Sequence, residues 1–122
     1  GGFYEYGEDG SKAIWPGLMD LYYNADASVA EDDIKDRLLF RQVIEALKCL
    51  ETNVLRTVAD GNIGSIMGIG APAWTGGLIQ FVNTYGLERF SARCAELANQ
   101  YGDRFDAPAI VGEKIAAGEN FA

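Results

Sequence analysis

Residues 36–86 read DRLLFRQVIEALKCLETNVLRTVADGNIGSIMGIGAPAWTGGLIQFVNTYG, and this stretch decides the fold. In its first half, apolar residues recur at three- and four-residue spacing and leave only a narrow polar stripe that contains Arg41 and Glu45. Such a wide apolar arc predicts a long helix with neighbours on several sides, the central helix of the domain. We place its start at Ser28, because Ser28 and Glu31 have the spacing of a capping box.

The second half of the stretch is unusually rich in small residues. A helix is predicted from Thr57, and it ends at the glycines of residues 68–70. Within it, four small residues recur at three- and four-residue spacing: Gly61, Gly64, Ser65 and Gly68. Each helical glycine costs roughly 1 kcal/mol relative to alanine, so we expect close packing against another backbone to offset that loss.

A proline turn at Pro72 follows this helix and continues through Trp74, Gly76 and Gly77. Glycine amides at the start of a helix can bind an anion, which is one possible role of the turn. The interpretation that we favour is structural: Trp74 fills the core, and Gly76 and Gly77 allow tight packing. Thr75 is then predicted to cap the next helix, which runs to about Tyr85.

The flanking sequence extends this helical pattern in both directions. Towards the C-terminus, helices are predicted from residue 87 or 88 to 100 and over 109–117. No segment shows the two-residue alternation of a half-buried strand, so the fold is predicted to be all-α, with about five helices around one long central helix. Residues 28–122 form this domain, and residues 1–27 are predicted to be an extended arm that packs on it, because their large apolar side chains are costly to leave in water.

Composition excludes several classes of function. The formal net charge is −8, from 18 acidic and 10 basic residues, and this surplus argues against binding to nucleic acid. No apolar run approaches the roughly 18 residues of a membrane span. The chain starts without a secretory signal, as though cut from a longer protein. Cys49 and Cys94 lie in apolar helical patterns typical of reduced, buried cysteines, which predicts a cytoplasmic protein.

The chain has no histidine, the side chain best suited to exchange protons near neutral pH. We therefore predict no catalytic residue, and the Gly68–Gly70 motif lacks the strand that a dinucleotide site requires. With no histidine and two distant cysteines, a zinc site is excluded. The carboxylates of Asp32, Asp33 and Asp36 are interpreted as a solvated helix face rather than a metal site.

Several motifs in this sequence resemble one family. They are Glu45-Ala46-Leu47 and the run ADGNIGSIMGIGAPAWTGG at 59–77, with further likeness at 2–6, 15–18, 95–98 and 101–102. On these residues the chain resembles the C-terminal helical domain of 3-hydroxyacyl-CoA dehydrogenases. It is most similar to the last such domain of the multifunctional fatty-acid oxidation proteins, and the likeness covers nearly the whole chain. The fold that this implies is like the C-terminal domain of 6-phosphogluconate dehydrogenase.

The resemblance implies a parent enzyme that oxidises L-3-hydroxyacyl-CoA to 3-ketoacyl-CoA with NAD in fatty-acid β-oxidation, together with an enoyl-CoA hydratase region. The family's catalytic histidine and glutamate lie on the nucleotide-binding side, so neither maps onto this chain. NAD and acyl-CoA would then be bound only by the parent. The chain would have a structural role, beside the upstream NAD-binding and first helical domains or in a homodimer.

One departure from the family limits what can be carried over. Single helical domains of the family have a PxGP turn, whereas this chain reads PAWTGG over 72–77. The difference matches the tandem second copy, and no acyl-CoA contact is assigned to any residue here.

Interface residues are predicted on weaker grounds. Arg41 and Glu45 are spaced to pair, either as an exposed pair or at the seam with another domain, and both interpretations stay open. Asn83 could cap a helix or bond across an interface. The alternative to a dehydrogenase domain is an independent helical association module with no enzymatic role.

Overall fold

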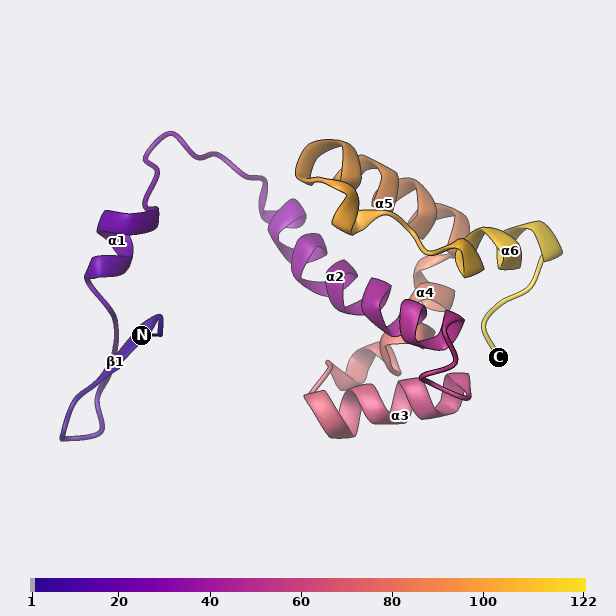
Figure 1. Cartoon of the computed structure of the whole chain (residues 1–122), viewed down its shortest axis with the longest axis horizontal. Helices are drawn as coiled ribbons and strands as arrows, with labels where there is room; N and C mark the ends of the chain where they lie inside the picture. The colour runs from indigo at the N-terminus through magenta and orange to yellow at the C-terminus, as the bar shows by residue number, and fades with distance from the viewer. Residues whose placement is uncertain (1) are drawn as a thin grey trace.

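The computed structural model describes residues 2–122, so Gly1 of the predicted arm lies outside the described residues. It is mostly helical, which confirms the predicted class (Figure 1). The elements are β1 (Tyr4–Tyr6), β2 (Lys12–Ile14), α1 (Gly17–Tyr22), α2 (Glu31–Glu51), α3 (Val58–Ile69), the 3-10 turn η1 (Ala73–Thr75), α4 (Leu78–Tyr85), α5 (Leu87–Tyr101), the 3-10 turn η2 (Asp103–Phe105) and α6 (Ala109–Ala117).

Helices α2 to α6 form one packed unit, in which α2 contacts all four of the others. Figure 1 shows α2 running between α3 on one side and α5 on the other. Phe40 of α2 is fully buried and stacks on Phe90 of α5, with ring centroids 4.8 Å apart. Each fully buried apolar side chain contributes about 1.5–3 kcal/mol. The core also contains Val43, Ile44, Leu47, Leu78, Ile79, Phe81, Val82, Leu87, Cys94, Leu97, Phe105, Val111 and Phe121.

The start of α2 differs from the prediction. The helix begins at Glu31 rather than Ser28, and its N-cap, Ala30, makes no side-chain capping bond. Tertiary contacts hold the first turn instead, because the Asp33 carboxylate accepts a 2.7 Å hydrogen bond from the Tyr101 hydroxyl of α5. The capping-box prediction was wrong because it considered only neighbouring residues. The bond from Tyr101, which is distant in the sequence, holds the first turn of α2.

Arg93 of α5 completes this anchor. Its guanidinium forms ion pairs with Asp33 and Asp36, and its Nε donates to Asp36 Oδ2 over 2.7 Å. The hydrogen bond from Tyr101, and then the contact with Arg93, lower the pKa of Asp33. The prediction of a freely solvated acidic face was therefore wrong for Asp33 and Asp36, which join α2 to α5.

The arm differs most from the prediction. It contains a short antiparallel hairpin, in which Tyr4 pairs with Ile14 and Gly10 turns the chain with a φ of 81°. Strands of three residues are too short to show an alternating pattern. Figure 1 shows the hairpin and α1 standing apart from α2–α6, so the expected packing on the domain is not found.

Contacts within the arm explain how it folds without that packing. Lys12 Nζ lies 3.9 Å from the Tyr4 ring centroid, and the Trp15 ring lies against Gly17. Most large apolar side chains of the arm nevertheless remain exposed. They are Phe3, Tyr4, Tyr6, Ile14, Trp15, Met19, Leu21, Tyr22 and Tyr23.

The boundaries of α3, α5 and α6 agree closely with expectation. Helix α3 is capped by Thr57, whose Oγ1 accepts from the Asp60 amide, and α6 ends at Gly118 in the left-handed conformation. Among residues 2–122, no helix is both long enough and apolar enough to cross a bilayer.

Candidate interdomain surface

The outer face of α3 is apolar and uncovered. Ile63, Met67 and Ile69 point to solvent, and Met67 is 81% exposed. Asp60 is the one charged residue of this largely apolar helix, and it lies on the same side as Ile63 and Met67, three and seven residues before them. A helix of this kind is normally buried, and a contiguous exposed apolar patch marks an interaction site. We call the exposed side chains of Ile63, Met67 and Trp74 the α3 face, whereas Ile69 is exposed on the side of the helix that faces α2.

The inner side of α3 is closely packed at one glycine. A Cβ added to Gly61 would lie 2.5 Å from Ile79 Cδ1, so α4 approaches α3 as the small-residue pattern predicted. Gly64 and Gly68 differ, since a Cβ at either position would meet nothing within 4 Å. The prediction of close packing holds for Gly61 and Ser65, the buried residues of α3, and not for Gly64 and Gly68.

Two polar side chains of α3 fix the start of α4. Asn62 Oδ1 accepts from the amides of Ile79 and Gln80 at 3.1 and 2.9 Å, and Ser65 Oγ accepts from the Leu78 amide at 3.2 Å. Three of the four otherwise unpaired amides of a helix start are satisfied in this way. Sequence reasoning named Ser65 only as a small packing residue and missed Asn62, although Asn and Ser inside a helix are a weak signal of such a role.

The turn before α4 is built from glycines in conformations that other residues rarely adopt. Gly76 and Gly77 have φ of 73° and 113°, and a Cβ at Gly77 would lie 2.5 Å from the Asn62 Cα. This tight packing confirms the predicted role of Gly77. Thr75 does not begin the helix as expected: its Oγ1 donates to the Pro72 carbonyl and accepts from the Gly77 amide, within η1.

Trp74 was expected to fill the core, and that prediction was wrong. Its side chain is 76% exposed, and its ring meets Phe81 edge-on at 6.4 Å between centroids. Thr75 occupies the buried position of the turn instead. A small hydroxyl that bonds to the turn backbone fits there, and Trp74 is left on the surface beside α3.

A groove of about 460 Å³ lies between α2 and α3. Its walls bring together Arg41, Glu45, Gly61 and Gly64, four residues that the sequence singled out. The remaining lining is mostly apolar: Gln42, Ala46, Cys49, Val54, Leu55, Asp60, Ser65, Ile69 and Leu78.

Arg41 and Glu45 form the predicted pair. Arg41 Nη1 lies 2.6 Å from Glu45 Oε1, and both side chains are partly exposed. Burial raises the pKa of Glu45, but the charges of Arg41 and Lys48 outweigh it, and the net effect is a lowered pKa. The pair belongs to the wall of an open groove. This position is compatible with an exposed pair and with a pair at the seam with another domain.

Asn83 bonds within the chain. Its Nδ2 donates to the Phe121 carbonyl over 2.7 Å, and the Phe121 amide donates to its Oδ1 over 2.9 Å. This pair of bonds holds the buried Phe121 ring against α4. Asn83 therefore secures the C-terminal segment.

The two thiols should differ in reactivity. Burial raises the pKa of Cys94 to about 12, so the thiol stays protonated and enclosed, whereas Cys49 lines the open groove. We expect a thiol reagent such as DTNB to label Cys49 in the folded protein and both cysteines after unfolding in urea. The Cys49→Ser variant serves as the control, and prompt labelling of that variant under native conditions would contradict the packing described for Cys94.

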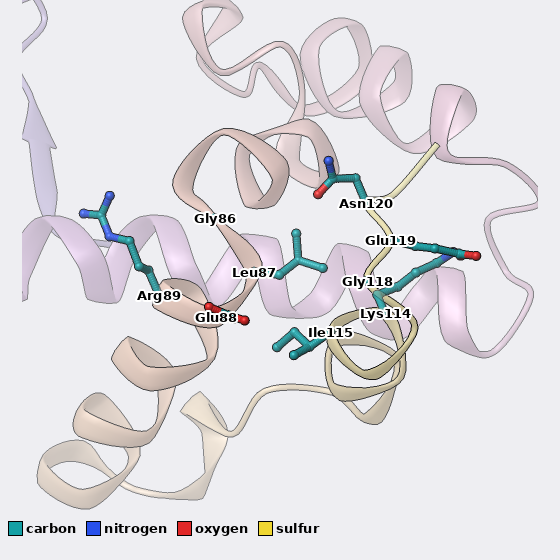
Figure 2. A pocket seen from close by; sticks show the side chains of 9 residues that line it. All are labelled: Gly86, Leu87, Glu88, Arg89, Lys114, Ile115, Gly118, Glu119 and Asn120. Carbon is teal, nitrogen blue, oxygen red and sulfur yellow. The ribbon is translucent and has the colours of Figure 1, made fainter.

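A second hollow, of about 320 Å³, lies between the start of α5 and the end of α6 (Figure 2). Its charged groups do not converge, because Figure 2 shows Leu87 and Ile115 lying between Arg89 and Lys114. Lys114 Nζ is already bound to Glu119 Oε2 at 2.7 Å. We therefore place the candidate site at α3 and its groove.

Nothing in residues 2–122 gathers three or more His, Cys, Asp or Glu side chains into a metal-binding group. A comparison of the sequence with protein-family models found no match.

Proposed function

We propose that this chain is a non-catalytic helical domain of an NAD-dependent 3-hydroxyacyl-CoA dehydrogenase that acts in fatty-acid β-oxidation. In this proposal it is the last helical domain of a cytoplasmic multifunctional enzyme, with the 6-phosphogluconate dehydrogenase type of fold around α2 as its central helix. Its parent would oxidise L-3-hydroxyacyl-CoA, and NAD and acyl-CoA would be bound by the preceding domains.

The observation that carries the proposal is the exposed α3 face. It lies within residues 59–77, the run on which the family resemblance rests most strongly. A domain that served only its own stability would gain from burying Met67 and Trp74, at about 1.5–3 kcal/mol for each side chain. Their exposure is explained if another domain covers them in the parent.

The open glycines of α3 fit the same role. Gly64 and Gly68 leave the helix backbone accessible beside Met67, so a partner helix could approach it closely. The small surface there supports helix-on-helix packing rather than a binding site for a small polar ligand. The exposed aromatic residues of the arm support a neighbouring domain as well, because they have little to pack on within this chain.

The test begins with the gene. Upstream of the codon for Gly1 it should encode a strand followed by GxGxxG, the dinucleotide-binding signature. The encoded NAD-binding and first helical domains, produced without this chain, should form NADH from 3-hydroxybutyryl-CoA poorly. Added chain should restore the rate, and NADH formation by the chain alone would overturn its non-catalytic role.

A matched pair of variants makes this test specific to the α3 face. Met67→Glu places a carboxylate on that face, where docking would have to desolvate it, so this variant should not restore activity. Ala116→Glu adds the same charge at an exposed position of α6 and should restore activity like the unmodified chain. Equal restoration by both would contradict docking through α3.

A second candidate is an independent association module that pairs with its own copy. The observation in its favour is that Asp60 is the one charged residue of α3, so two chains of net charge −8 would bring few like charges together if they paired through Ile63 and Met67. Sedimentation of the 122-residue chain distinguishes the two candidates. A dimer that Met67→Glu dissociates, from a gene without GxGxxG, would favour the module.

A further inference from the structure

A second exposed surface lies on α2, on the side that faces η2. It surrounds a hollow of about 380 Å³ lined by Ile34, Arg37, Leu38, Arg41, Arg104 and Phe105. We call these six residues the arginine surface. Three of the chain's six arginines are gathered here, on a protein whose net charge is −8.

Two of the three guanidinium groups form no ion pair within the described chain, although the charge of Arg37 contributes to the lowered pKa of Asp33. Arg37 lies over the Tyr101 ring, 4.2 Å from its centroid, and Arg104 lies over the Phe105 ring at 5.5 Å. Neither forms an ion pair with a carboxylate of residues 2–122. Stacked in this way, the two groups are oriented by aromatic rings and keep their hydrogen-bond donors available.

Arg41 has a different role in this surface. Its Nη1 is shared between Glu45 Oε1 at 2.6 Å and the backbone carbonyl of Arg104 at 3.1 Å. It therefore joins η2 to α2 and places Arg104 beside the helix. The charge that a partner would meet comes from Arg37 and Arg104.

Apolar side chains lie between these charges. Ile34 and Leu38 are largely exposed, and Leu38 is 67% accessible. Residues 34, 37, 38 and 41 have the spacing of one helix face, so apolar and cationic groups are interleaved for two turns of α2. Phe105 is buried beneath them.

The shape of this surface distinguishes between two kinds of anion. Residues 34 to 41 extend over about 10 Å of helix axis, at about 1.5 Å per residue, which is longer than a phosphate group. A compact anion would use the two arginines and leave Ile34 and Leu38 exposed. An amphipathic helix with carboxylates beside apolar side chains would cover all four groups, in the groove-binding mode known for helices.

We propose that the arginine surface binds an acidic amphipathic helix of another polypeptide segment. Its carboxylates pair with Arg37 and Arg104, and its apolar side chains cover Ile34 and Leu38. The surface is separate from the α3 face, so the proposal does not depend on the dehydrogenase assignment. It gives the chain a second docking site. The arginine surface recognises its partner by charge, whereas the α3 face recognises its partner by apolar contact.

The probe is a synthetic amphipathic helix of about 18 residues, long enough to be helical, with leucines on one face and glutamates beside them. Titrated into the labelled 122-residue chain, it should shift the amide NMR signals of residues 34–41 and 103–105. A peptide with glutamine in place of glutamate should bind about tenfold or more weakly. Raised salt should weaken binding of the glutamate peptide alone.

Variants of the chain locate the contact. Arg37→Glu with Arg104→Glu should weaken binding about tenfold or more, and so should Leu38→Ala, which leaves the fold intact because Leu38 is exposed. Arg56→Glu with Arg89→Glu is the matched control, because it makes the same change of charge at two exposed arginines that have no ion pair in the described residues and lie outside the hollow. It should bind like the unmodified chain.

Three results would overturn the proposal. In the first, Arg56→Glu with Arg89→Glu weakens binding as much as Arg37→Glu with Arg104→Glu, which would indicate diffuse attraction. In the second, the glutamine peptide binds as well as the glutamate peptide. In the third, inorganic phosphate shifts the same amides at millimolar concentration and Leu38→Ala has no effect on the peptide, which would indicate a compact anion site.

Discussion

Gly77→Ala is expected to lower the free energy of unfolding by about 3–5 kcal/mol. Gly77 has φ of 113° and ψ of 159°, a region that is nearly restricted to glycine and costs another residue about 1–3 kcal/mol. The new methyl group would also lie 2.5 Å from the Asn62 Cα, on backbone that cannot move without shifting α3. Overpacking of this kind adds about 1–3 kcal/mol.

Urea denaturation, followed by circular dichroism, measures this loss. Gly64→Ala is the matched control, because it also adds one methyl group beside the α3 backbone but meets nothing within 4 Å. It should raise stability by about 0.5–1 kcal/mol, the usual gain when a helical glycine becomes alanine. Similar midpoints for the two variants would contradict the close approach of α4 to α3.

The pair of variants also separates folding from docking. Gly64→Ala should be more stable in isolation, yet its methyl group lies on the open side of α3, where the proposed partner would approach. Gly64 lowers the stability of the helix, and no neighbour within the chain requires a glycine there. Close approach of a partner would explain the glycine more readily than the fold does. Measuring the dehydrogenase activity that each variant restores compares its stability with its ability to dock.

Helices were predicted well where their signals are local. Thr57 caps α3 and Gly118 ends α6, because a hydroxyl before a helix and a left-handed glycine after it act on the nearest amides and carbonyls. The same reasoning failed at Ser28. There the Tyr101 hydroxyl and the Arg93 guanidinium, more than 55 residues away in the chain, hold the first turn of α2.

The candidate site was predicted only in part, because an apolar residue can lie either in the core or on an exposed surface, and the sequence alone does not say which. Sequence reasoning placed Trp74 in the core because large aromatic side chains are usually buried. Within this chain the Trp74 ring lies at the surface, and in our proposal another domain covers it. Composition cannot distinguish a core residue from an exposed one, whereas the exposed fractions of Met67 and Trp74 show directly that neither lies in the core of this chain.

Asn62→Ala is expected to cost about 2–3 kcal/mol. The Asn62 side chain accepts from both the Ile79 and the Gln80 amides, and its loss would leave two donors at the start of α4 without their acceptor. Each unsatisfied buried donor costs about 1–3 kcal/mol, and the loss of a helix cap about 0.5–2 kcal/mol. The two effects overlap, so they do not add in full.

Asn62→Asp distinguishes this explanation from a simple loss of packing. The carboxylate keeps an acceptor oxygen at the same place and adds a negative charge at a helix start, where the dipole favours it. We expect its stability to lie within about 1 kcal/mol of the unmodified chain at neutral pH. Equal losses in both variants would show that shape matters there rather than the acceptor.

The consequence extends to the proposed docking. Asn62 and Ile63 are neighbours on α3, and the bonds from Asn62 to α4 fix the rotation of the helix that presents Ile63 and Met67 outward. If Asn62→Ala loosens this joint, the α3 face loses its fixed orientation before the chain unfolds. Activity restored by the added chain should then fall for Asn62→Ala at temperatures where its circular dichroism is still native, and recover in Asn62→Asp.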